Sequence, residues 1–591
     1  MFFSSKNSAQ GEQARPRRKV GCLGGCLIFF AIYFLCSAIL GWIMGDMFSS
    51  GSVKLEDNTV YRLQLKGTLV EQAKEDNPFA DIMGSMPYSS YYGTDETVGL
   101  DNILSNIRLA KNDDKILGIW LDGAQLNASP ASAKAIRDAL LDFKTSGKWV
   151  IASAKNYGQT NYYIASVADR ICIDPTGSVA WVGLSGQKMY YTRVLEKIGV
   201  EMQIVKVGTF KSAVEPFFRT SMSDADRKQT EEYLKGIWDE YKSAVGASRH
   251  LTEAQLNTLA DRYMALQSAE EQVKAGLADT IVYQQDMDSL LRVYTGTKDY
   301  KKLTTDELAS VKRPESKAKD KVAVLYLEGQ IYDDGSDGIV GKEAVKTLKK
   351  IQKNDDVKAL VIRVNSPGGS ADASEQIWHA IQKIKADSIP VVVSMGDLAA
   401  SGGYYISCGA DYIFAEPTTI TGSIGIFGTI PNVSKLRNKI GLDIDGVSTN
   451  KHSDLEFNMI YKGMNPEERQ LMQSMVERGY DLFTSRCAEG RHVEQSYIKS
   501  IGEGRVYLGA RGVELGIVDK LGNIDDAIDK AVELTGLDNY QLTYYPEKKD
   551  PWEELLKSFD KTTDEEKLIL KVREFCSKPR IMALMPEVKI N

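Results

Sequence analysis

The chain has 591 residues, 43% of them hydrophobic and 26% charged, and its formal net charge is −7. This length exceeds what one hydrophobic core supports, so two or more domains are expected. The slightly acidic balance offers no basic surface for nucleic acid, and we expect no nucleic-acid partner.

The first predicted element is an apolar segment from Val20 to Gly45, which follows the basic cluster RPRRK. As a helix its 26 residues would reach roughly 39 Å, more than the ~30 Å hydrocarbon core of a bilayer. A cleavable signal peptide has a shorter apolar region and a small-residue cleavage site. We therefore predict a cytoplasmic tail (1–19) and an uncleaved transmembrane anchor (20–45), with the remaining chain on the outer side. A buried core helix is the alternative, and the basic flank argues against it.

The remaining chain repeats itself. The motif KNDD at 111–114 recurs 242 positions later at 353–356, and at the same offset NYYIASVADRICI matches GYYISCGADYIFA. Further pairs are VYRLQLKGTLV with VAVLYLEGQIY, and PTGSVAWVG with ITGSIGIFG. The sequence therefore contains two copies of one domain of roughly 250 residues.

Within each copy, short apolar runs alternate with amphipathic helical stretches. ALVIRVN and IPVVVSM have the composition of buried strands, whereas ASEQIWHAIQKIKA has helical spacing of its apolar residues. This alternation predicts an α/β fold with largely parallel sheets. We predict an N-terminal repeat domain (55–310), a charged linker (311–321), a C-terminal repeat domain (322–545) and a C-terminal helical extension (546–591).

The two copies differ in their glycine-rich turns. The second copy contains NSPGG at 365–369 and SGG at 401–403, where the first has GAQLN and QTN. A serine in such a turn is a weak nucleophile and needs a base beside it. The four histidines lie outside these turns, and His379 is more typical of a helix surface. A Ser-His-Asp triad is therefore not supported for Ser401.

Lysine is the other known partner of a nucleophilic serine. An ordinary lysine is protonated at neutral pH, but burial in apolar surroundings lowers its pKa. Lys211, in VGTFKSAVEPFF, has such a setting, although a solvated lysine at a strand end is the simpler interpretation. Backbone N–H groups of Gly369 and Gly402 are the candidate donors for an oxyanion, with a plain β-turn as the alternative.

The motifs NSPGGS, MGDLAASGGYYIS, TGSIGIFG and VGTFKSAVEPF together resemble the signal peptide peptidase A (protease IV) family. The similarity is to its long, duplicated, membrane-anchored bacterial form and extends over nearly the whole chain. It implies two tandem Clp-protease/crotonase-like domains built from repeated ββα units. One position departs from the family pattern: Asp397 stands where a small residue is common.

The resemblance implies a serine/lysine dyad divided between the copies. Ser401 would be the nucleophile, Lys211 the general base, Ser423 the residue that orients the amine, and the turn at Gly368 and Gly369 the oxyanion site. It further implies a serine protease that degrades remnant signal peptides and other short apolar peptides at the bacterial inner membrane, as a homotetramer. No Cys/His metal spacing occurs, and no metal or cofactor is expected.

Two alternatives remain open at this point. A crotonase-like acyl-CoA enzyme would also use glycine-rich oxyanion turns, but it would need neither an anchor nor Ser401. A catalytically inactive membrane scaffold would need none of Ser401, Lys211 and Ser423.

Overall fold

The computed structural model describes the chain in several stretches: 53–72, 97–311, 313, 316–335, 338–547, 580–585 and 589–590. The predicted tail (1–19) and anchor (20–45) lie outside them. Among the described residues, no helix has the length and apolar character needed to cross a bilayer. The described residues from 55 to 309 and from 313 onward form one compact unit, which contains the described parts of both predicted repeats.

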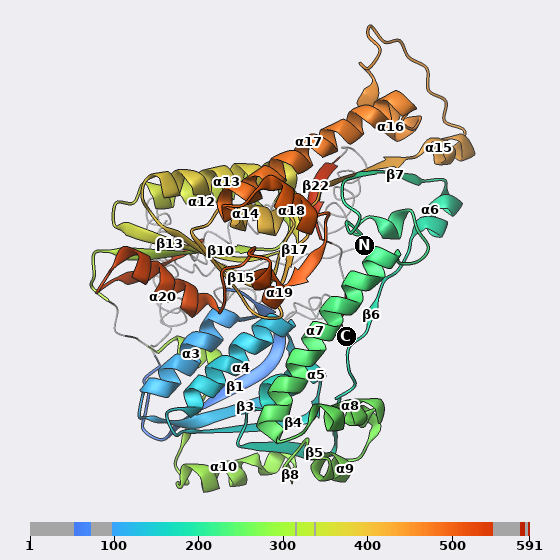
Figure 1. Cartoon of the computed structure of the whole chain (residues 1–591). Helices are drawn as coiled ribbons and strands as arrows, with labels where there is room; N and C mark the ends of the chain where they lie inside the picture. The colour runs from blue at the N-terminus through green and yellow to red at the C-terminus, as the bar shows by residue number, and fades with distance from the viewer. Residues whose placement is uncertain are drawn as a thin grey trace, which may run out of the picture. The chain divides into compact units, whose positions relative to one another are not determined.

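The first repeat is built on a parallel sheet that contains β1, β3, β4 and β5 (Figure 1). Its main path runs β2-β1-β3-β4-β5-β8, with β9 beside β1. Its strands are β1 (Thr59–Val70), β2 (Thr97–Gly99), β3 (Ile116–Asn127), β4 (Trp149–Tyr157), β5 (Arg170–Val179), β8 (Thr280–Ile281) and β9 (Lys301–Leu303). Its helices are α3 (Leu100–Asn112), α4 (Pro130–Lys144), α5 (Gln159–Ala165), α6 (Thr192–Ile198), α7 (Asp224–Arg249), α8 (Glu253–Asp261), α9 (Ala269–Lys274), α10 (Met287–Thr295) and α11 (Thr305–Ala309).

The second repeat has a related, mostly parallel sheet, with the path β19-β17-β15-β13-β10-β21 and with β16 and β20 branching from β15. Strand β19 runs antiparallel to β17. Its strands are β10 (Lys321–Glu328), β13 (Val357–Ser366), β15 (Val391–Ala400), β16 (Tyr412–Ala415), β17 (Ile420–Gly422), β19 (Val506–Leu508), β20 (Lys520–Leu521) and β21 (Gln541–Tyr545). Its helices are α12 (Gly341–Gln352), α13 (Ala371–Ala386), α14 (Gly402–Ser407), α15 (Ser434–Ile440), α16 (Leu455–Tyr461), α17 (Pro466–Arg491), α18 (Gln495–Ile501), α19 (Gly509–Glu514) and α20 (Ile524–Thr535).

The predicted strands and helix of the second repeat are confirmed. ALVIRVN lies in β13 and IPVVVSM leads into β15, and both strands are almost continuously buried, as expected where helices cover both faces of a parallel sheet. ASEQIWHAIQKIKA lies in α13. The duplication extends to helix ends: α7 and α17 each have 26 residues and are followed by His250 and His492, both with positive φ.

A third sheet joins the repeats. Its order is β12-β11-β14-β22-β18-β7, and β7 (Glu201–Lys206) is the one strand in this path that comes from the first repeat. The others are β11 (Ile331–Tyr332), β12 (Ile339–Val340), β14 (Gly368–Ser370), β18 (Phe427–Asn432) and β22 (Arg580–Leu584). β7 runs antiparallel to β18, and Val205 of β7 is part of the second repeat's hydrophobic core.

The prediction of a helical C-terminal extension is wrong where the structure describes that segment beyond Glu547. Residues 580–584 form strand β22, which lies antiparallel between β14 and β18. Lys589–Ile590 forms β23, which pairs with β6 (Gly186–Gln187). These residues are extended because the neighbouring strands offer backbone hydrogen bonds that the local sequence does not reveal.

Candidate active site

Ser401 lies at the junction between strand β15 and helix α14. Its side chain is fully buried, and its backbone has φ +56° and ψ −115°, an unusual conformation for a residue with a Cβ. The turn is held by two backbone hydrogen bonds, because Ser401 N–H donates to the Gly422 carbonyl at 2.8 Å and its own carbonyl accepts from Tyr405 at 2.8 Å. Such strain persists only where the surroundings impose it, and it is typical of functional sites.

Lys211 follows β7 by five residues and is held by the second repeat. The N–H of Val207 donates to Ile426 at 3.0 Å, and that of Phe210 donates to Glu503 at 2.9 Å. The side chain of Lys211 is 0% exposed. Strand β7 of the first repeat pairs with β18 of the second in the third sheet. The segment that follows β7 therefore carries Lys211 into the interior of the second repeat.

The Lys211 amine contacts two serines of the second repeat. Its Nζ lies 2.7 Å from Ser401 Oγ, 3.0 Å from Ser423 Oγ and 3.0 Å from the Ser423 carbonyl oxygen. Ser423 Oγ donates to the Gly504 carbonyl at 3.3 Å, so its lone pairs are available to accept from the amine. A neutral amine has two N–H donors and one lone pair. With both donors directed at Ser423, the lone pair faces the Ser401 hydroxyl.

The electrostatic setting of Lys211 favours the neutral amine. Burial lowers the pKa of Lys211 well below its ordinary value of 10.5, because removal from water penalises the charged form. The ring of Phe427 has its centroid 6.0 Å from Nζ and forms part of these apolar surroundings. A lysine whose pKa is lowered in this way is a better proton acceptor than an exposed lysine, which stays protonated at neutral pH.

The three predicted oxyanion glycines differ in what their N–H groups do. Gly402 is the first residue of α14, so its N–H belongs to the first helical turn, which lacks intrahelical acceptors. The N–H of Gly368 donates to Ser366 Oγ at 3.1 Å and is already engaged. Gly369 lies in β14, between β11 and β22. The oxyanion roles of Gly368, Gly369 and Gly402 remain predictions.

A large cavity lies beside these residues. It has a volume of about 910 Å³, and its walls include Pro367 of the NSPGG turn. They also include Ala213, Leu398 and Ile420, which lie two or three residues in sequence from Lys211, Ser401 and Ser423 respectively. Its walls also include Gln159, the counterpart of Ser401 in the first repeat. The cavity therefore extends from the candidate site of the second repeat to the corresponding position of the first.

Two features of the site escaped the sequence analysis. Gly504 packs on Lys211, since a Cβ at residue 504 would lie 2.6 Å from Lys211 Cβ. A polar network upstream of Ser401 contains Arg363, whose position inside the apolar run ALVIRVN was an available signal of a buried partner. His379 is exposed on α13, in agreement with its interpretation as a helix-surface residue. In the described part of the chain, no group of three or more His, Cys, Asp or Glu side chains could hold a metal ion.

Comparisons with known proteins show the family of the chain. The model of peptidase family S49 matches residues 142–297 and 383–538, one match in each repeat and together more than half of the chain, and the Clp protease model matches 315–420. Protease 4 of Salmonella typhi is 35% identical over 496 residues, covering 82% of this chain and 79% of the relative. Protease 4 of Haemophilus influenzae is 34% identical over 535 residues, covering 86% and 84%.

A solved structure of the 1510-N membrane-bound stomatin-specific protease with a substrate peptide is similar over 44% of this chain and 99% of that chain, at 18% identity and a TM-score of 0.26. The duplicated α/β fold and the close relatives define the class of this protein as a serine protease. The chain belongs to peptidase family S49, in the duplicated form of the signal peptide peptidase A type.

We expect Gly504→Ala to impair protease activity by about a hundredfold, because the new methyl group would displace Lys211 from Ser401. The rate of labelling by a fluorophosphonate probe for reactive serines, with the melting temperature measured in parallel, provides the measurement. Gly536→Ala is the matched control, since Gly536 also has positive φ (+64°) but a Cβ there would have no neighbouring atom within 4 Å. Equal labelling of the two variants would contradict the role assigned to Gly504.

We expect Lys211→Met to become increasingly stable relative to wild type as pH falls below 10.5. The unfolded wild-type chain takes up a proton at Lys211 in this range, whereas the native site keeps the amine neutral down to its lowered pKa. The unfolded state therefore binds more protons, and wild-type stability declines by about 1.4 kcal/mol for each pH unit within the window. Urea unfolding at a series of pH values measures the difference, and Lys197→Met, at an exposed lysine, should show no such trend.

Proposed function

We propose that this chain is a membrane-anchored serine endopeptidase with a Ser401/Lys211 dyad that degrades remnant signal peptides and other short apolar peptides. The observation that carries the proposal is the 2.7 Å separation of Lys211 Nζ and Ser401 Oγ inside a water-excluded site. Each group comes from a different repeat, which explains why the second copy contains a serine turn and no base of its own.

The first half of the reaction follows from the amine's orientation. Neutral Lys211 accepts the proton of Ser401 as Oγ attacks the carbonyl carbon of the scissile peptide bond. The N–H groups of Gly369 and Gly402 stabilise the oxyanion that develops. The protonated amine then gives its proton to the leaving nitrogen, and an acyl-enzyme ester remains on Ser401.

In the second half, Lys211 acts again as base. It takes a proton from water, the resulting hydroxide attacks the ester carbonyl, and Ser401 recovers its proton as the peptide acid departs. Ser423 has the orienting role throughout, because its carbonyl and hydroxyl oxygens each lie 3.0 Å from the amine. Loss of either contact would free the lone pair to turn away from Ser401.

The substrate class is supported by the cavity beside the dyad. Apolar side chains form much of its wall, among them Phe217, Ile237, Leu398, Ile420 and Met585. An extended apolar peptide could fill such a space while its backbone lies along the glycine turns. The predicted anchor at 20–45 would place the site at the outer face of the inner membrane, where signal peptides are released.

We expect both Ser401→Ala and Lys211→Ala to reduce hydrolysis of a fluorogenic signal-peptide sequence by about a thousandfold or more, because the two groups act as one unit. The full chain in detergent is the sample, and fluorescence release gives the rate. His379→Ala is the control and should retain full activity, since His379 is exposed on α13.

Undiminished cleavage by either alanine variant would mean that the nucleophile or the base is misassigned. A wild-type chain that cleaves no peptide and does not react with a fluorophosphonate would favour a scaffold function. Specific binding of coenzyme A by that inactive chain would favour the acyl-CoA alternative.

We further propose that the protein assembles as a homotetramer. The segment from the end of α15 to α16 supports self-association, because it exposes apolar side chains, including Ile440 at 68%, Leu442 at 50% and Val447 at 103% exposure. Exposed apolar groups gathered in one segment are typical of contact surfaces.

We therefore expect Ile440→Asp combined with Val447→Asp to lower the mass of the detergent-solubilised assembly from four copies to fewer. Light scattering coupled to size-exclusion chromatography measures this mass. Val293→Asp changes a residue of α10 that is 76% exposed and should leave the mass unaltered. A tetramer that persists in the double variant would exclude this segment as the contact.

A further inference from the structure

The strand that leads to Ser401, β15, contains a bulge of three residues. Val364 of β13 pairs with Met395 of β15, and the next pair in the ladder is Ser366 with Ala399. Residues 396–398 therefore stand opposite Asn365 alone, three residues against one. Bulges of this kind re-direct the chain that follows them and are common beside active sites. Here the bulge ends three residues before the nucleophile.

Side chains replace the ladder hydrogen bonds that the bulge removes. The Leu398 N–H donates to Asn365 Oδ1 at 3.1 Å, and Thr419 Oγ1 donates to the Gly396 carbonyl at 2.7 Å. Gly396 fits closely, because a Cβ there would lie 2.5 Å from Glu71 Oε1. The bulge is thus a fixed structure whose shape depends on polar side chains of its neighbours.

Asp397, at the centre of the bulge, links it to the first repeat. One carboxylate oxygen accepts the Ser132 N–H at 2.8 Å, and the other accepts the Ser132 hydroxyl at 2.8 Å. Ser132 is the third residue of α4, where backbone N–H groups lack helical acceptors and favour an anion. A carboxylate of the second repeat therefore caps a helix of the first.

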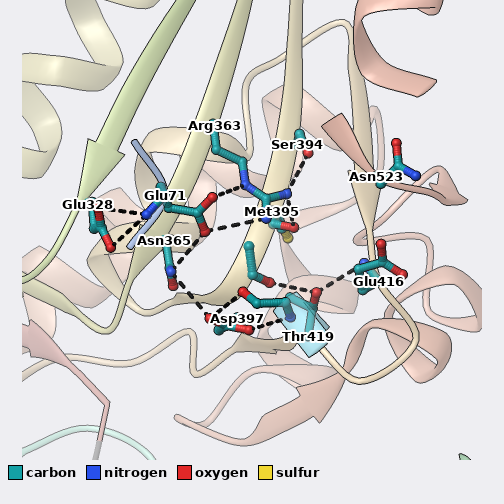
Figure 2. A network of polar contacts seen from close by, with 12 residues as sticks. Glu71, Glu328, Arg363, Asn365, Ser394, Met395, Asp397, Glu416, Thr419 and Asn523 are labelled. Carbon is teal, nitrogen blue, oxygen red and sulfur yellow. Dashed lines mark hydrogen bonds and ion pairs between the residues drawn. The ribbon is translucent and has the colours of Figure 1, made fainter. Parts of the chain in front are cut away.

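The same network links Asp397 to Asn365 of β13, to Glu71 and to Arg363 (Figure 2). Asn365 Nδ2 donates to Glu71 Oε1 at 2.9 Å and lies 3.5 Å from Asp397 Oδ2. Glu71, just after β1 of the first repeat, forms a buried ion pair with Arg363 at 2.8 Å. Arg363 also donates to Ser394 Oγ at 2.9 Å and to the Met395 carbonyl at 3.1 Å, immediately before the bulge.

We propose that Asp397 is a positioning residue, whose carboxylate fixes the bulge between helix α4 and Asn365 and thereby sets the turn that presents Ser401. The inference rests on the proposed function of Ser401 and adds a role for the first repeat besides supplying Lys211. Asn365 is adjacent to Ser366, whose hydroxyl accepts from Gly368, so the same contacts reach the candidate oxyanion turn.

The contacts favour a positioning role over substrate binding. Asp397 and Leu398 both border the cavity, so a carboxylate that bound substrate would be possible there. Both carboxylate oxygens, however, already accept hydrogen bonds from Ser132. Burial and the nearby Glu71 raise the pKa of Asp397, while the two bonds from Ser132 oppose that rise and favour its charged form.

The test compares kcat with KM in the full-length protein. For Asp397→Ala we expect kcat per titrated serine to fall about tenfold or more, because small displacements of a nucleophile are costly, while KM changes less than about twofold. Asp397→Asn keeps one acceptor and should recover part of the loss. Asp142→Asn, at an exposed carboxylate on the same helix α4, is the control.

Ser132→Ala provides a second approach from the other side of the contact, in case Asp397→Ala does not fold. It should lower kcat by about threefold alone and have no further effect in the Asp397→Asn background, since coupled residues are not additive. Unchanged kcat in Asp397→Asn and Ser132→Ala, or a rise in KM alone, would overturn the inference. A wild-type chain without hydrolysis or probe labelling would instead overturn the proposed function on which it depends.

Discussion

The contact between the Lys211 amine and Ser401 depends on enclosing the amine away from water, because burial is what lowers its pKa well below the ordinary value. Neither repeat can do this alone. The first supplies Lys211 from the segment after β7, and the second encloses it with Ser423, Phe427 and Gly504. The antiparallel pairing of β7 with β18 and the buried position of Val205 follow from this requirement. The desolvation that destabilises a charged lysine is therefore compensated by the packing between repeats.

The first repeat contacts the site of the second repeat but has no serine of its own at the corresponding turn, where Gln159 stands. Its counterpart of Ser401, Gln159, accepts the N–H groups of Val182 and Gly183, and its Nε2 donates to Gly183, so its amide is satisfied within the repeat. The first repeat makes three separate contacts with the second near this site, through Lys211, the start of α4 and Glu71. Each part reaches the second repeat close to the turn of Ser401 or to the strand that leads to it.

Sequence patterns predicted the parts of this arrangement that depend on local chemistry. Buried strands, glycine turns and an apolar setting for Lys211 are visible within a few residues, and the family resemblance added Ser423. Contacts between distant positions were not visible: Ser132 and Asp397 are 265 residues apart. Gly504 matters only because Lys211 is folded against it, and β22 is a strand only because two edges flank it. Such features depend on tertiary proximity, which a single sequence does not encode locally.

The buried charges near Asp397 contribute more to the positions of their neighbours than to the free energy of folding. An ion pair such as Arg363–Glu71 loses hydration on burial, and apolar residues of similar volume often stabilise a protein equally well. Its advantage is direction, because the planar guanidinium holds Glu71, Ser394 and the Met395 carbonyl at fixed angles. A three-residue bulge has no ladder to define its shape, and directional bonds supply that definition. These bonds fix the end of β15, and the position of the strained turn at Ser401 depends on where that strand ends.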